Sequence, residues 1–102
     1  NELALLSDKI GADIDNVRAG FTSDSRINPA FFSPGIGYGG SCFPKDVRAL
    51  IHMGKQHDLE LKLLKAGDEV NERQKQILTQ RLIERMGNLK GLTVAVWGLA
   101  FK

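Results

Sequence analysis

The sequence has one cysteine and two histidines among its 102 residues, and this scarcity limits the chemistry that the chain can support. A single cysteine cannot form an internal disulfide. With only His52 and His57 beside it, Cys42 cannot complete a cysteine-rich zinc site, and we expect no metal site. Cys42 is therefore either an inert core residue or a reactive thiol.

A large excess of charge is also missing, because the formal net charge is +2 and lysine and arginine form no concentrated run. This balance argues against nucleic acid or a membrane surface as a partner. No apolar run approaches the roughly 20 residues that cross a bilayer, and no signal peptide opens the chain, so we expect a cytoplasmic location. The start at Asn1 and the end at Lys102, after a strand-like run, suggest a fragment of a larger protein.

Apolar residues recur at helical spacing along most of the chain, and the pattern predicts four helices. Asp13 is a candidate N-cap of the second helix. Pro44 suits the start of the third, where the N–H that proline lacks would have no helical partner. The predicted helices cover residues 3–10, 14–21, 44–57 and 66–86. The polar stretch NERQKQ, residues 71–76, is expected to face solvent or a neighbouring subunit.

The C-terminal run LTVAVWGLAFK, residues 92–102, differs from the rest because it is short and rich in β-branched and apolar residues. This pattern is typical of a buried strand that leads into a turn. We therefore expect a mostly α fragment of an α/β protein. Residues 1–87 form its helical part, and residues 88–102 form a linker and the first strand of a second, α/β domain.

A long non-periodic segment from Thr22 to Ser41 ends in the stretch SPGIGYGGSCFPKD, residues 33–46. Glycines 35, 37 and 40 match the G-x-G-x-x-G pattern of dinucleotide-binding turns. That pattern needs a preceding strand, which prolines 29 and 34 disfavour. Dense glycine also permits positive φ angles and close approach of the backbone to a ligand, so a ligand-binding loop and a plain surface loop both stay open.

Cys42 lies two residues before the predicted third helix. The N-terminus of a helix favours a thiolate over a thiol, and Lys45 adds a positive charge nearby. Asp46 can accept hydrogen bonds from the first turn or position a water. The alternative is that Cys42 is a small buried apolar residue and PKD an ordinary start of a helix.

The motif PGIGYGGSCFPKD resembles the catalytic-cysteine signature of the UDP-glucose/GDP-mannose dehydrogenase family. GADIDNV, SDSRI, VNERQK and VAVWGLAFK extend the resemblance along the whole chain. The family has an N-terminal NAD-binding Rossmann domain, a helical central domain that forms a homodimer, and a C-terminal α/β domain that binds UDP or a similar nucleotide. The resemblance implies that residues 1–87 are the central dimerisation domain and residues 88–102 the beginning of the C-terminal domain.

The resemblance also implies the reaction and its residues. A sugar C6 alcohol, preferably that of UDP-glucose, is oxidised to a carboxylate while two NAD⁺ are reduced. Cys42 matches the nucleophile that forms a thiohemiacetal and then a thioester, Asp46 the aspartate that assists the water, and Lys45 a lysine near NAD. Arg26 matches an arginine that reaches the substrate site of the neighbouring subunit. The implied substrate-binding residues are Arg26, Phe31, Phe32, Ser33, Pro34, Gly35, Gly37, Tyr38, Gly39 and Lys102.

Asn28 departs from the family pattern, since many members have glycine at this position. The choice of sugar therefore stays open, with GDP-mannose and UDP-N-acetylmannosamine as alternatives to UDP-glucose. A further alternative is a dimerisation module that has no activity as an isolated fragment.

Overall fold

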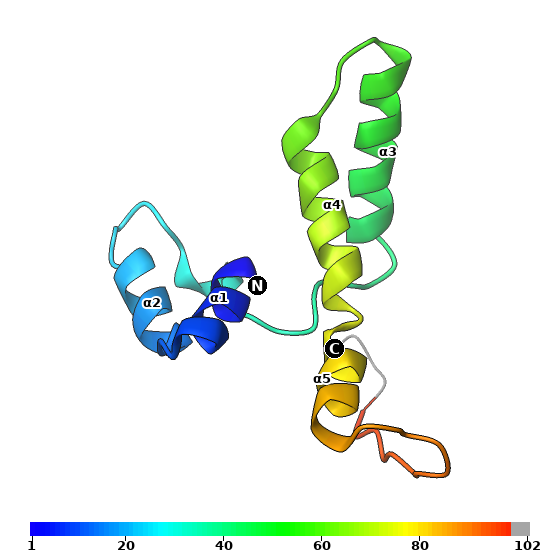
Figure 1. Cartoon of the computed structure of the whole chain (residues 1–102). Helices are drawn as coiled ribbons and strands as arrows, with labels where there is room; N and C mark the ends of the chain where they lie inside the picture. Colours follow the sequence, from blue (N-terminus) through cyan, green and yellow to red (C-terminus); the bar gives the residue numbers. More distant parts are fainter. Residues whose placement is uncertain (99–102) are drawn as a thin grey trace. The chain divides into compact units, whose positions relative to one another are not determined.

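Helices account for all the regular secondary structure of residues 1–98, the part of the chain that the computed structural model describes. The elements in chain order are α1 (Glu2–Ile10), α2 (Ile14–Phe21), the 3₁₀ helix η1 (Pro29–Phe31), α3 (Phe43–Gln56), α4 (Lys62–Gln74) and α5 (Ile77–Met86) (Figure 1). The chain divides into two units, Asn1–Gly37 and Tyr38–Lys102. The predicted mostly helical composition is confirmed.

Capping residues define the helices of the first unit. Gly11 ends α1 with a φ of 72°, and the N–H of Ala12 donates to Ser7 O at 2.9 Å. Asp13 is the N-cap of α2, as predicted, and its carboxylate accepts a hydrogen bond of 2.8 Å from the N–H of Asp15. The predicted bounds of α2 and the predicted end of α1 are therefore confirmed, and α1 begins one residue earlier than predicted.

The loop that follows α2 contains more structure than its composition predicts. The side chain of Asn28 accepts a hydrogen bond of 3.0 Å from the N–H of Ala30 and caps η1. The Arg18 guanidinium donates to Pro29 O at 3.1 Å, and the rings of Phe21 and Phe32 meet edge to face with centroids 5.0 Å apart. These contacts fix the first part of the loop against α2.

In the second unit, α3 and α4 lie side by side and run in opposite directions (Figure 1). The connection is tight at Gly54, where an added Cβ would lie 2.7 Å from Leu59 O and 2.9 Å from Leu61 Cγ. The N–H of Leu59 donates to Gly54 O at 2.9 Å, and Asp58 adopts a φ of 54°. This is a Schellman end in which aspartate takes the place usually held by glycine.

The prediction of one helix over residues 66–86 is wrong, because α4 ends at Gln74 and α5 begins at Ile77. At the break the N–H of Gln76 donates to Arg73 O, three residues back, at 3.0 Å. A bond of this 3₁₀ type interrupts the i to i−4 pattern without any glycine or proline.

The expectation that residues 71–76 face solvent is also wrong in part. Asn71 and Gln74 are buried, although the residues between and after them are exposed. A spacing of three places both on the same face of α4, because residues three apart are neighbours on a helix. As for the predicted strand, residues 92–98 contain none, and its remaining residues, 99–102, lie outside the described part.

Few apolar side chains are buried in this helical chain. Val47 is the only apolar residue that residues 1–98 bury almost completely, while many large apolar side chains stay exposed. The exposed set includes Leu3, Leu6, Ile10, Phe31, Ile36, Leu50, Met53, Leu63, Ile83 and Met86. Exposed apolar residues in this number usually mark surfaces that another segment or molecule covers.

We predict that Gly54→Ala opens the α3–α4 pair, because a Cβ cannot fit against the Leu59 carbonyl. Overpacking of this kind costs about 1–3 kcal/mol. Gly67→Ala in α4 is the matched control, since nothing lies within 4 Å of an added Cβ there. That control gains up to about 1 kcal/mol from helix propensity.

Hydrogen exchange of the α3 and α4 amides, followed by mass spectrometry, measures both effects. We expect faster exchange for Gly54→Ala and unchanged or slower exchange for Gly67→Ala. Equal exchange in the two variants would contradict close packing at Gly54.

Candidate functional site

Cys42 is exposed and occupies the N-cap position of α3. Its carbonyl accepts a hydrogen bond of 2.9 Å from the N–H of Asp46, which closes the first turn. Its Sγ lies 3.6 Å from Ser41 Oγ. The alternative of a buried Cys42 is therefore wrong for the described residues, and the thiol is accessible at the positive end of a helix dipole.

Lys45 and Asp46 both lie in the first turn of α3, and both are exposed. The i, i+4 spacing places Asp46 on the same face of the helix as Cys42. A thiol, a carboxylate and an ammonium group are thus gathered within one helical turn. Such a group can supply a nucleophile, a base for a water molecule and a positive charge for an anionic ligand.

The glycine-rich loop adopts backbone conformations that suit only glycine at two positions. Gly37 has a φ of 100° and Gly40 a φ of 91°, whereas Gly35 and Gly39 lie outside the positive-φ region. The preceding element is η1, a 3₁₀ helix, so residues 29–43 lack the strand–turn–helix order of a dinucleotide-binding turn. The match to G-x-G-x-x-G is therefore not a dinucleotide fingerprint.

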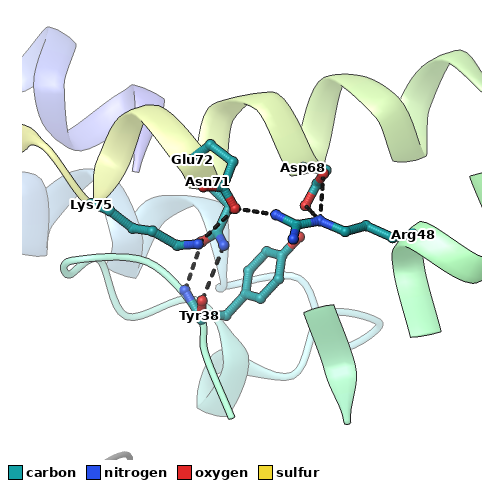
Figure 2. Close-up of polar contacts among 6 residues, drawn as sticks. All are labelled: Tyr38, Arg48, Asp68, Asn71, Glu72 and Lys75. Atoms are coloured by element: carbon teal, nitrogen blue, oxygen red, sulfur yellow. Dashed lines mark hydrogen bonds and ion pairs between the residues drawn. The ribbon is translucent and has the colours of Figure 1, made fainter. Parts of the chain in front are cut away.

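Asn71 of α4 holds the backbone of this loop (Figure 2). Its Oδ1 accepts a hydrogen bond of 2.8 Å from the N–H of Tyr38, and its Nδ2 donates one of 3.0 Å to Tyr38 O. The side-chain amide thus satisfies both polar groups of one loop residue, 33 positions away in the sequence.

The Tyr38 side chain forms a second anchor. Its ring meets that of Phe43 edge to face with centroids 4.9 Å apart and an interplanar angle of 76°. Figure 2 shows the ring extending from the loop toward the Arg48 guanidinium. Burial and, to a smaller extent, the nearby Asp68 carboxylate raise the pKa of the Tyr38 hydroxyl above its usual value. Tyr38 is therefore neutral at physiological pH and acts through its backbone and its ring.

Ion pairs join α3 to α4 next to this contact (Figure 2). Arg48 Nε donates to both carboxylate oxygens of Asp68, at 3.1 and 3.3 Å, and Arg48 Nη2 pairs with Glu72. Lys75 Nζ lies 2.6 Å from the same Glu72 oxygen. The hydrogen bond from Lys75, with a smaller contribution from Arg48, lowers the pKa of Glu72, and the bond to Asp68 raises that of Arg48.

In the first unit, four predicted substrate-binding residues line one hollow of about 240 Å³. They are Phe31, Phe32, Ser33 and Pro34, and they face α1 and α2 across it. Arg18 also lines the hollow, and its Nε is buried without a hydrogen-bond partner among the described residues. The N–H of Gly35, just beyond, donates to Asn1 Oδ1 at 2.8 Å.

Arg26 lies in the loop after α2 and is held by Asp24. The guanidinium donates to the Asp24 carboxylate from Nη2 at 2.6 Å and from Nε at 2.9 Å, and the Arg26 N–H adds a bond of 2.9 Å. The Arg26 side chain is nevertheless 85% exposed. These bonds lower the pKa of Asp24 and raise that of Arg26. The structure therefore presents an ordered guanidinium to the exterior of its unit.

Two residues of interest escaped the sequence analysis. Asn71 lies seven positions, or two helical turns, after Leu64 and so continues the inward face of α4. That spacing could have revealed Asn71. Arg18 lies four positions after Ile14 and shares the apolar face of α2 in the same way. Lys102, predicted to contact the nucleotide, lies outside the described residues.

Residues 1–98 contain no cluster of His, Cys, Asp or Glu side chains that could hold a metal ion. Over the same range, no helix combines the length and the apolar character that a membrane span requires.

Known proteins resemble this chain both in sequence and in structure. Residues 1–73 match the central domain of the UDP-glucose/GDP-mannose dehydrogenase family. A UDP-glucose 6-dehydrogenase of Pseudomonas aeruginosa is 50% identical over 103 residues, which cover 100% of this chain and 23% of that protein. One of Bacillus subtilis is 44% identical over 102 residues, covering 100% of this chain and 22% of that protein.

A solved structure of a UDP-glucose dehydrogenase from the hyperthermophilic archaeon Pyrobaculum islandicum is also similar. The TM-score is 0.85 and the sequence identity 42%, over 89% of this chain and 21% of that one. The chain thus spans less than a quarter of the length of these relatives.

We predict that acid weakens the α3–α4 pair through Glu72. Because the folded-state pKa of Glu72 is lowered, its stabilising effect is complete above the usual pKa of glutamate, about 4.3, and is lost as the pH falls through the lower folded value. The effect is small because the group is exposed to solvent.

The urea midpoint of helix unfolding, measured by circular dichroism, tests this effect. On acidification from pH 6 to below about 4, the midpoint should fall less for Glu72→Gln than for the original chain. Glu69→Gln, which removes the same charge from the same helix, should behave like the original chain, and equal behaviour of all three would contradict the role of Glu72.

Proposed function

The chain belongs to the UDP-glucose/GDP-mannose dehydrogenase family, and we propose that it is part of an NAD-dependent UDP-glucose 6-dehydrogenase. The resemblance drawn from its cysteine motif is thereby confirmed at the level of the family. The observation that carries the proposal is the exposed Cys42 at the N-terminus of α3, directly after a loop with two positive-φ glycines. UDP-glucose is preferred because the relatives described above are named for it.

In the proposed reaction, the C6 alcohol of the sugar is first oxidised to an aldehyde. The Cys42 thiolate attacks the aldehyde carbon and forms a thiohemiacetal, whose loss of a hydride leaves a thioester on Cys42. Water then cleaves the carbon–sulfur bond, which releases the carboxylate and the thiol. Covalent attachment keeps the aldehyde from escaping and divides a four-electron oxidation into smaller steps.

NAD supplies the hydride acceptor for both oxidation steps when it is bound. The exposed ammonium of Lys45 fits the negative charge of a dinucleotide beside Cys42. Asp46, on the same helical face as Cys42, takes the proton from the water that attacks the thioester. The residues that bind the dinucleotide itself are proposed to lie in a Rossmann domain outside this chain.

The nucleotide sugar is proposed to bind along residues 31–39 and at Lys102. Phe31, Phe32, Ser33 and Pro34 contribute the hollow of the first unit, and Gly35, Gly37, Tyr38 and Gly39 contribute backbone that a ligand can approach closely. Residues 88–102 are proposed to be the linker and the first strand of a C-terminal α/β domain that binds UDP. A strand needs a hydrogen-bonded neighbour, which that domain would provide.

We further propose that the parent protein is a cytoplasmic homodimer that associates through residues 1–87. Support comes from the large apolar side chains that the helices leave exposed. It also comes from Arg26, whose guanidinium is exposed and ordered by Asp24. A group presented outward in this way can enter the substrate site of a partner subunit and pair with a phosphate or a sugar hydroxyl.

The first test is Cys42→Ser in the full-length protein. The change should abolish UDP-glucuronate formation, because a hydroxyl is far less ionised than a thiol at neutral pH. Ser41→Ala, which alters the neighbouring residue and leaves the thiol, is the control and should retain product formation. Product is measured with UDP-glucose, GDP-mannose and UDP-N-acetylmannosamine. Near-normal turnover by Cys42→Ser, or a greater rate with either of the other sugars, would reject the corresponding part of the proposal.

The second test asks whether Arg26 serves the partner subunit. Arg26→Ala and Cys42→Ala should each be nearly inactive alone. In a mixed dimer, one site receives an intact Cys42 from the first chain and an intact Arg26 from the second. Random pairing of equal amounts makes half the dimers mixed, with half of their sites intact, so about a quarter of the original activity should return.

Complete subunit exchange is verified first with differently tagged chains. If Arg26 acts within its own chain, every site keeps one defect and mixing restores no activity. The absence of recovery after verified exchange would therefore reject the assignment of Arg26 to the partner's site.

A further inference from the structure

We propose that Asn71 is the positioning residue that fixes the loop Tyr38–Cys42, called the cysteine loop below, and with it the Cys42 thiol. Its effect on catalysis rests on the proposed function of Cys42, whereas its effect on the order of the loop does not. The argument starts from an unusual combination in α4: a polar side chain that is only 2% exposed and that bonds to a distant loop.

The Asn71 amide uses its donor and its acceptor on the same residue. Oδ1 accepts from Tyr38 N, and Nδ2 donates to Tyr38 O. Buried polar groups without partners are costly, so the arrangement is favourable only while both bonds are made. Removal of the amide would leave the N–H and the C=O of Tyr38 unpaired in a part-buried place.

Two contacts, both made by Tyr38, hold the ends of the cysteine loop. Asn71 fixes the backbone of Tyr38, and the Tyr38 ring packs on Phe43, the first residue of α3. Between these anchors lie Gly39, Gly40, Ser41 and Cys42. Two glycines in so short a stretch permit many conformations, and ordering each residue costs about 1–2 kcal/mol. The anchors reduce that freedom.

Ion pairs to α3 flank Asn71 on α4. Asn71 lies between Asp68 and Glu72, the two α4 residues that pair with Arg48 of α3 (Figure 2). Asp68 is itself mostly buried, with a side-chain exposure of 19%. The position of the Tyr38 backbone is therefore tied to the helix that carries Cys42 at its N-terminus. Two routes, one through α4 and Arg48 and one through Phe43, connect the cysteine loop to α3.

Reacting groups must be held close to their productive geometry, and a misplacement of about 1 Å can reduce a rate about 100-fold. Loss of the Asn71–Tyr38 bonds should therefore lower kcat by about 10- to 100-fold. The KM for NAD should change little, because Asn71 contacts the loop backbone and not Lys45.

The experiment compares three variants of the full-length protein. Asn71→Ala removes both hydrogen bonds. Asn71→Asp keeps the shape but replaces the donor by a second acceptor. Leu64→Ala is the matched control. Leu64 is partly buried and lies two turns, or about 10 Å, earlier along the same face of α4, so its loss should weaken the helix at a distance from the Tyr38 contact. Hydrogen exchange of the peptide that contains residues 38–42 is measured beside kcat and thermal unfolding.

We expect Asn71→Ala to accelerate exchange of this peptide at least about tenfold and to lower kcat. Leu64→Ala should lower the unfolding temperature but leave the exchange rate and the kcat within about twofold of the original values. Exchange does not depend on activity. If the original protein lacks dehydrogenase activity but its loop is protected, and Asn71→Ala removes that protection, the loop role is sustained and only the proposed function is rejected. Unchanged exchange in Asn71→Ala, or equal loosening in Leu64→Ala, would overturn the role of Asn71.

Asn71→Asp supplies a signature that general destabilisation cannot imitate. Its ionised carboxylate opposes Tyr38 O, but its protonated form can donate to that oxygen and restore the pair. Burial raises the pKa of such a carboxyl group. The exchange protection of residues 38–42 and the kcat are each divided by the value of the original protein at the same pH. Both ratios should therefore be low at about pH 8 and should rise on acidification to about pH 5.5. If both ratios are equally low at the two pH values, the paired hydrogen bonds are overturned as the cause. This comparison does not need Asn71→Ala, so it decides the question even if that variant fails to fold.

Discussion

The paired hydrogen bonds between the Asn71 amide and the Tyr38 backbone are the interaction on which the second unit depends. They attach a glycine-rich loop to α4 at the point where Arg48 attaches α4 to α3. The same helix α3 carries Cys42 at its N-terminus. Loop, helix pair and thiol thus form one connected structure, whose contacts are mainly polar because apolar burial among residues 1–98 is slight.

This scarcity of buried apolar surface gives the polar contacts their importance. Val47 is the one large apolar side chain that is nearly fully buried in the described chain. Hydrophobic burial is proportional to area and has no direction, so a small core specifies a geometry poorly. Hydrogen bonds and bidentate ion pairs do have direction, and those of Asn71, Arg48 and Asp24 each order a segment near a proposed functional residue. The exposed apolar faces are of the kind that another segment or molecule usually covers.

Local sequence signals predicted most of the helices, and they failed where the structure depends on distant contacts. Gly11, Asp13 and the start near Pro44 act within one turn, so capping rules found them. The break between α4 and α5 has no breaker residue, and its single i to i−3 bond left no trace in the sequence. Cys42 and its loop were recognisable as a motif. Asn71 was assigned to a solvent-facing stretch because its partner lies 33 residues away.

An amide is well suited to the place that Asn71 occupies. It carries a donor and an acceptor side by side, as a peptide group does, and so it pairs with Tyr38 in the manner of a neighbouring strand. A carboxylate would offer only acceptors, and an apolar side chain would leave both peptide groups unpaired. The amide does not titrate at physiological pH, so the contact does not depend on pH in that range. Since it recognises backbone, it also leaves the Tyr38 ring free to pack on Phe43. The loop can therefore be both rich in glycine, which permits close approach to the proposed ligand, and fixed in space, which the proposed covalent chemistry at Cys42 requires.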